Sequence, residues 1–218
     1  MTTLLRRTYS LARWLILLEV GIWRSLFLWV TRRVPGQRRG VQSFSYAQQV
    51  TPILGGFIFV SAVEVPVVHL LLPWQTVRFI VLGIGIWGLL WMVGLLASMR
   101  VFRHLLDDTA LHIRRGTNVA IRIPWDAVES VNGRRGSVRT NKPVQVEGSD
   151  DSAVAHVAVL KQTNVAVVLS RSIPVQLSDG AQQVTEVRFY VDDLRAFLAK
   201  ASEHLVEPLP AATERLAL

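Results

Sequence analysis

Glu64 and His69 are the residues of the first half of the chain best placed to do chemistry, because both lie in an apolar run, "SAVEVPVVHL" (Ser61–Leu70). An ionisable side chain inside a bilayer is costly and is a candidate for ion or proton handling. Pro66 leaves the carbonyl of Ala62 without its usual helical donor, and a protonated Glu64 can supply one. We therefore interpret Glu64 as a protein-facing, structurally bonded residue, with proton handling as the alternative. His69 is interpreted as lying near the membrane interface.

Glu19 is a third ionisable residue with apolar neighbours, in the segment "SLARWLILLEVGIWRSLFLWV" (10–30). On a helical wheel Arg6, Arg13 and Arg24 share one stripe, and leucine and isoleucine side chains lie opposite. That pattern is typical of a basic helix lying in the interface against anionic lipid, although the segment is also long enough to span. Glu19 lies in the middle of the apolar face, so we expect it to be protonated and bonded to a neighbouring helix.

The sequence offers no recognisable catalytic or metal site. It contains no cysteine, so a thiol nucleophile and thiolate ligands are excluded. Its five histidines are scattered and show no metal-binding spacing. The run "GIGIWG" (83–88) matches a dinucleotide-binding pattern, but it lies inside an apolar span with no preceding strand, so we interpret its glycines as helix-packing positions. We expect no catalytic residue, no metal, no cofactor and no enzymatic activity.

Charge separates the two halves of the chain. Residues 1–99 hold nine arginines against Glu19 and Glu64, whereas residues 100–218 hold 15 basic and 14 acidic residues. The positive charge therefore accompanies the apolar half, which indicates contact with anionic lipid headgroups. A nucleic-acid-binding protein would place that charge on a soluble face, so we expect no nucleic-acid partner.

Two apolar segments, 50–72 and 77–98, are each about 20 residues long, the length that a membrane-spanning helix needs. Only "PWQT" separates them, so they predict a transmembrane hairpin. Arginines flank both of its outer ends, at 32, 33, 38, 39, 100 and 103, and only Arg78 lies near its tip. The positive-inside rule therefore places both ends, and the C-terminal half, in the cytoplasm.

Beyond about Asp107 the pattern changes to short alternating runs that predict roughly seven strands, followed by a helix from Leu194. "NGRRGS" and "EGSDDS" are expected to be turns. The first belongs to a basic loop that carries Arg134, Arg135, Arg139 and Lys142. We interpret this loop as facing lipid headgroups or a partner; a solvated charged turn is the alternative.

The phrase "RIPWDAVESV", with Ile123, Pro124, Trp125, Val128 and Val131, and the final "VDDLRAFLAKASEHL" are similar to the bacterial pleckstrin-homology-like domains attached to membrane helices. The resemblance covers about residues 100–205. It implies a split, bent seven-stranded β-barrel plugged by the C-terminal helix, in a fold that hosts lipid binders, peptide binders and scaffolds.

The expected architecture is thus an α-helical membrane region over 1–99, an α+β cytoplasmic domain over 100–206 and a flexible tail over 207–218. We expect a non-enzymatic module that tethers, scaffolds or regulates a membrane-protein partner at the cytoplasmic face of a bacterial inner membrane, in contact with anionic lipids. One alternative is an accessory subunit of a transporter or ion-linked complex that uses Glu64, and another is an intramembrane enzyme. The oligomeric state stays open.

Overall fold

A computed structural model describes residues 2–36, 38, 40–117, 119–140, 142–148, 152–177 and 180–206, with side chains from 15 to 205. Its chain contacts divide it into two compact units. The first contains Met1–Gln37, Ser45–His104 and Arg114–Ala120, and the second contains Arg38–Phe44, Leu105–Ile113 and Ile121–Leu218. The predicted tail, 207–218, and the side chains of Arg6 and Arg13 lie outside the described residues.

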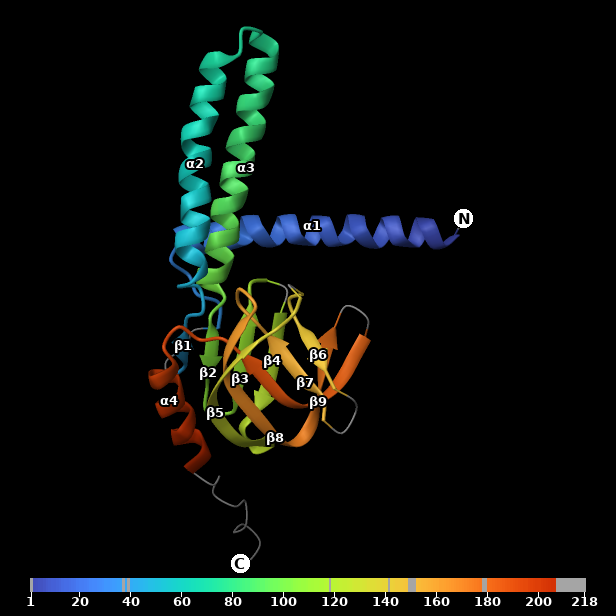
Figure 1. The fold of residues 1–218 in the computed structure, drawn as a ribbon, viewed down its shortest axis with the longest axis vertical. Helices are drawn as coiled ribbons and strands as arrows, with labels where there is room; N and C mark the ends of the chain where they lie inside the picture. The colour runs from blue at the N-terminus through green and yellow to red at the C-terminus, as the bar shows by residue number, and fades with distance from the viewer. Residues whose placement is uncertain are drawn as a thin grey trace, which may run out of the picture. The chain divides into compact units, whose positions relative to one another are not determined.

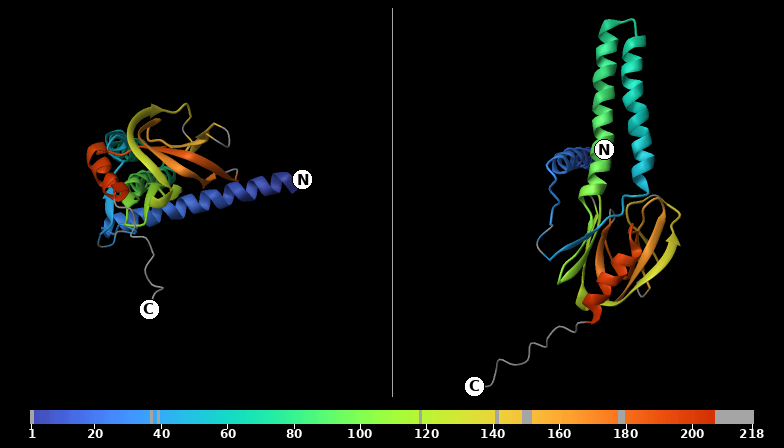
Figure 2. Two further views of the ribbon diagram at one scale, coloured as in Figure 1. Left: turned by 90° about the horizontal axis from the view of Figure 1, so that it is seen from below. Right: turned by 90° about the vertical axis from the view of Figure 1, so that its left-hand side faces the viewer.

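The first unit is built from three helices: α1 (Thr2–Val30), α2 (Val50–Leu71) and α3 (Gln75–Val101). The helices α2 and α3 run side by side as a hairpin, and α1 crosses them steeply (Figures 1 and 2). By length and composition α2 and α3 could each cross a membrane. The helix α3 extends the predicted span 77–98 at both ends, because no helix-breaking residue interrupts Gln75–Val101. The helix α2 matches the predicted span 50–72 to within one residue.

Glycines allow the close approach of these helices. A Cβ added at Gly85 of α3 would lie 2.7 Å from a methyl group of Val65 on α2. At Gly94 a Cβ would lie 2.5 Å from a methyl group of Ile22 on α1. Small residues let helix backbones pack closely where lipid supplies no hydrophobic drive between helices. In the run "GIGIWG" the interpretation of the glycines as packing positions is confirmed at Gly85, whereas a Cβ added at Gly83 or Gly88 would meet nothing within 4 Å. Gly94, outside that run, is a second close-packed glycine.

The strands form two sheets, and most of their residues, together with the last helix, belong to the second unit. One sheet has the order β1-β2-β3-β4 and the other has the order β5-β8-β9-β7-β6. The pairings β2–β3, β5–β8, β8–β9 and β6–β7 are antiparallel, and β7–β9 is parallel. The bounds are β1 (Gln42–Phe44), β2 (His104–Leu106), β3 (Ala110–Arg115), β4 (Val119–Pro124), β5 (Val128–Ser137), β6 (Gln145–Glu147), β7 (Val154–Val157), β8 (Gln162–Leu177), β9 (Gly180–Phe189) and α4 (Leu194–Val206).

The number of strands predicted beyond Asp107, roughly seven, agrees with the seven strands β3 to β9 of the described residues, but their bounds need correction. Two further strands, β1 and β2, lie before Asp107 and were not predicted. The runs "VAVVLS" (165–170) and "IPVQL" (173–177) were expected to be separate strands, but they join into the single strand β8. The pairing of β8 with β9 shifts register between them, from Val168 to Ile173. The predicted turn "NGRRGS" is strand β5, because the register shift between Gly133 and Gly136 accommodates the two glycines as a bulge within the strand.

The helix α4 packs on strands from both sheets. Phe197 is fully buried, and its ring meets those of Phe44 and Phe189 edge to face, at centroid distances of 5.2 and 5.4 Å. Leu194 and Leu198 lie over Gly133 of β5. Each buried aromatic or leucine side chain contributes about 1.5–3 kcal/mol. The second unit therefore has an apolar core of its own, to which the predicted C-terminal helix contributes.

Candidate functional site

Glu19 joins α1 to α3. Its Oε1 accepts a hydrogen bond from the indole N–H of Trp23 at 2.7 Å, and its Oε2 accepts one from the indole N–H of Trp91 at 3.1 Å. The expected bond to a neighbouring helix is present. Ile22, one turn further along, is buried against Gly94.

Glu64 and His69 are not brought together, and neither meets Glu19. Glu64 is exposed on α2 and lines a groove of about 490 Å³ with Ser61 of the same helix and with Gly85 and Gly88 of α3. His69 is half-buried beside the ring of Phe79, 5.9 Å between centroids.

A second cavity lies where α1 ends, α2 begins and α3 ends. We call it the helix-base pocket; its volume is about 830 Å³. It is lined by the end of α1 and the residues after it, by the start of α2 and by the end of α3: Leu28, Trp29, Val30, Arg32, Arg33, Val34, Ser45, Ala47, Gln48, Thr51, Pro52, Arg100, Val101 and Arg103. Four arginines from two separate parts of the sequence thus share one cavity.

The end of α1 has a defined cap that positions two of these arginines. The N–H of Arg33 donates to the Leu28 carbonyl at 2.9 Å, and the N–H of Arg32 donates to the Trp29 carbonyl at 3.1 Å. This is the Schellman pattern, in which the residue after the helix adopts the left-handed conformation and is usually glycine. Arg32 occupies that place with φ of 54°.

Tyr46 anchors the segment that leads into α2. It is fully buried, its ring lies 4.8 Å from that of His104, and its hydroxyl oxygen accepts the N–H of Gly116 at 2.7 Å. Burial raises the pKa of Tyr46 to about 12, against the lowering effects of this hydrogen bond and of Arg115. The phenol is therefore a neutral structural group at physiological pH.

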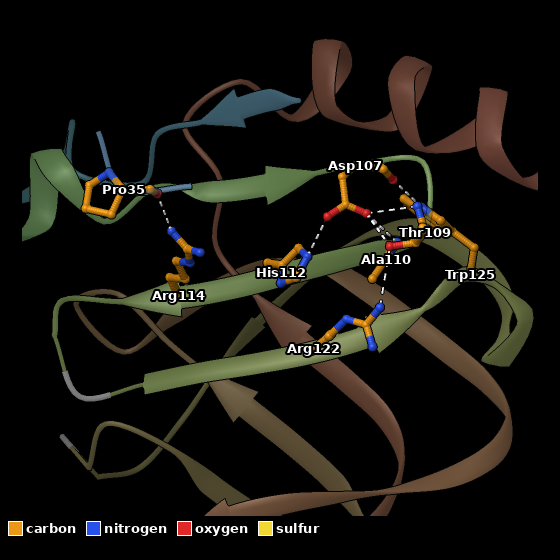
Figure 3. A network of polar contacts seen from close by, with 8 residues as sticks. All are labelled: Pro35, Asp107, Thr109, Ala110, His112, Arg114, Arg122 and Trp125. Atoms are coloured by element: carbon orange, nitrogen blue, oxygen red, sulfur yellow. Dashed lines mark hydrogen bonds and ion pairs between the residues drawn. The ribbon is translucent and has the colours of Figure 1, made fainter. Parts of the chain in front are cut away.

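The densest polar network of the second unit surrounds Asp107 (Figure 3). One carboxylate oxygen accepts the N–H and the hydroxyl of Thr109 and the N–H of Ala110, at 2.7–2.8 Å, and the other lies 2.8 Å from Nε2 of His112. The indole of Trp125 donates to the Asp107 carbonyl at 2.7 Å. Asp107 thus organises the β2–β3 turn and holds the tryptophan of the "RIPWDAVESV" phrase.

The remaining predicted basic residues do not form one site. Arg24 is exposed on α1, and Arg134 and Arg135 are exposed on β5, where Arg134 lies 4.0 Å from Glu186. Arg139 and Lys142 follow that strand and are also exposed. In the described part of the chain no three potential metal ligands gather as a metal site.

Comparisons with known proteins returned no match: no family model, no curated protein and no solved structure is similar to this chain.

Sequence reasoning used Arg32, Arg33, Arg100 and Arg103 to orient the hairpin but did not group them as a pocket. The available signal was the excess of arginine over acid near the ends of the apolar spans. Sequence reasoning also missed the buried Tyr46, because an isolated tyrosine in a loop belongs to no recognisable pattern.

We predict that Glu19→Ala destabilises the first unit by about 1–3 kcal/mol, because it leaves two indole donors without their acceptor. Thermal unfolding of the full chain in a mild detergent measures this, with Glu64→Ala as the matched control on an exposed glutamate. An equal loss in both variants would show that the Glu19 bridge does not hold α1 to α3.

Asp107 predicts loss of stability in acid. Burial raises the pKa of Asp107, but the hydrogen bonds from Thr109, His112 and Ala110 outweigh it and hold that pKa well below its usual range. Its contribution to the free energy of unfolding is therefore complete above about pH 4 and is lost as pH falls toward the lowered pKa. Denaturant titrations between neutral and acid pH should show a smaller pH dependence in Asp107→Asn; an unchanged dependence would contradict this assignment.

Proposed function

We propose that this protein is a non-enzymatic, membrane-anchored module that holds its α+β unit at the cytoplasmic face of a bacterial inner membrane, where that unit tethers, scaffolds or regulates a membrane-protein partner. The observation that carries the proposal is the contrast between the hairpin and the second unit. No residue of α2 is buried, although its side chains are overwhelmingly apolar, whereas the second unit has a packed core of its own. A lipid environment explains such an exposed apolar surface.

The crossing of α1 supports an interfacial rather than a spanning α1. Trp91, which meets Glu19, lies about 21 Å along α3 from Val77 and therefore about 9 Å inside the cytoplasmic boundary of a hydrocarbon layer about 30 Å thick. With the hairpin along the membrane normal, α1 crosses at that depth and lies close to the membrane plane. Its exposed apolar residues, among them Ile16, Val20 and Phe27, then contact lipid.

In this proposal the α+β unit is the part of the protein that contacts the membrane-protein partner. Two sheets with a C-terminal helix are compatible with the proposed pleckstrin-homology-like fold, and the ring of Trp125 stacks on His204 of α4 at 4.7 Å. A tethered domain acts through its raised local concentration beside other membrane proteins, without needing a catalytic centre.

The absence of cysteine allows a direct test of topology. In intact cells a membrane-impermeant maleimide should label Thr76→Cys, at the hairpin tip, and should label Ser202→Cys, on α4, only after the cells are opened. Both positions are exposed, so access depends on the side of the membrane. Labelling of both from outside, or recovery of the protein in the soluble fraction, would contradict the proposal.

Glu64 favours one alternative, an accessory subunit of a transporter or ion-linked complex. Its exposed carboxyl group in the hairpin requires a hydrogen-bond donor, which a partner's membrane helix seated in the groove beside Gly85 and Gly88 would supply.

We expect Glu64→Gln to retain both membrane-partner association in mild detergent and any proton flux in reconstituted vesicles, because the amide still donates and accepts a hydrogen bond. Glu129→Gln, on an exposed strand position, is the control. Loss of flux in Glu64→Gln with association preserved would favour the ion-linked alternative, since an amide cannot carry the proton.

A further inference from the structure

We propose that the helix-base pocket binds the phosphate headgroup of an anionic membrane lipid. The inference rests on the proposed membrane placement of the hairpin and adds a defined ligand site to it. The pocket has the three properties that such a ligand needs: uncompensated positive charge, an apolar wall, and a position at the ends of the apolar helices.

Charge is the first property. Arg32 and Arg33 follow α1, and Arg100 and Arg103 lie at and just beyond the end of α3. Among the residues with described side chains, no carboxylate forms an ion pair with any of these four arginines. The only acids before Asp107 are Glu19, which is occupied by two indole donors, and Glu64 in the span. The protein therefore leaves this group of guanidinium ions to an external anion.

Two of the four arginines, Arg100 and Arg103, have side-chain contacts that restrict them. The guanidinium of Arg100 lies over the ring of Trp29, 6.0 Å from its centroid, and Nε of Arg103 donates to the Arg100 carbonyl at 3.1 Å. Both side chains are half-buried. A planar guanidinium can bind phosphate oxygens with two parallel N–H groups, so a pre-positioned arginine suits phosphate better than a mobile lysine does.

The apolar wall and the depth indicate a lipid rather than a free anion. Leu28, Val30, Val34, Pro52 and Val101 line the pocket beside the arginines. Thr51 and Pro52 begin α2, and Arg100 and Val101 end α3, so the cavity lies where the spans leave the hydrocarbon and meet headgroups. A volume of about 830 Å³ falls in the range of small-molecule sites, which is about 300–1,000 Å³.

The cap of α1 supplies an independent observation. Glycine is the favoured residue in the left-handed position of a Schellman motif, yet Arg32 stands there with φ of 54°. The left-handed backbone of Arg32 is strained, and the guanidinium of the same residue lines the pocket. The variant Arg32→Gly can therefore distinguish a loss of lipid binding from a loss of folding, because glycine at this position relieves the strain and removes the charge.

The test measures lipid binding to the full chain in mild detergent by native mass spectrometry during titration with phosphatidylglycerol. Arg100→Gln/Arg103→Gln should weaken binding about 30-fold, since each arginine near a lipid surface contributes about 1 kcal/mol. The control, Arg171→Gln/Arg195→Gln, removes the same charge from exposed positions on β8 and α4 and should leave the affinity within about twofold. Equal losses in the two double variants would overturn the pocket as the site.

Arg32→Gly guards against a loss that merely reflects misfolding. It should bind phosphatidylglycerol about fivefold more weakly while its melting temperature stays the same or rises. Unchanged binding in this variant and in Arg100→Gln/Arg103→Gln would overturn the proposal.

Two further arms identify the source of the phosphate. Phosphatidylcholine should bind much more weakly, because its choline neutralises the headgroup charge, and inorganic phosphate should compete poorly, because it lacks the acyl chains. Efficient competition by inorganic phosphate would make free phosphate the ligand and overturn the lipid assignment. Because binding in detergent does not depend on topology, intact binding with failed maleimide labelling would count against the proposed orientation and not against the pocket.

Discussion

The crossing of α1 over α3 is the contact on which the first unit depends. Gly94 lets Ile22 approach the backbone of α3, and Glu19 spans the same crossing with one carboxyl oxygen on each of two indoles. A carboxyl group beside an apolar helix would be costly if it were left without donors. Trp23 and Trp91 supply those donors, so a residue that is awkward in the sequence becomes the polar bond between two otherwise apolar surfaces.

The helix-base pocket follows from that crossing. Because α1 is held against α3, its C-terminal cap lies close to the last turn of α3 and the first turn of α2. Four arginines then surround an apolar cavity with no acidic partner in the described side chains. The proposed lipid site therefore uses the same arginines from which the positive-inside rule predicts the orientation of the hairpin.

The second unit follows a different physical logic. Its two clearest polar networks are internal: Asp107 is surrounded by donors from its own turn and by His112, and Arg188 pairs with Glu186 at 2.6 Å. Its core is sealed by Phe197 and its neighbours on both sheets. The polar networks of this unit therefore stabilise its fold.

The sequence by itself determined the elements whose signals are local. The long apolar runs of α2 and α3, the helical spacing from Leu194 and the alternation in β3 and β4 report periodicity along one segment, so these elements were predictable. It also showed that Glu19 needed a donor, though not which one. The strand β1, the continuation of β5 through "NGRRGS" and the fusion of two runs into β8 depend on strand partners far along the chain.

Tertiary structure alone decided the sites. The bond from Trp91 to Glu19 joins residues 72 positions apart, and that from Gly116 to Tyr46 joins residues 70 apart. Likewise Arg32 and Arg100 share one pocket only because helix packing brings two helix ends together. Periodicity records which face of a segment is apolar, but it does not record which distant segment will cover that face or what charge will line the space between them.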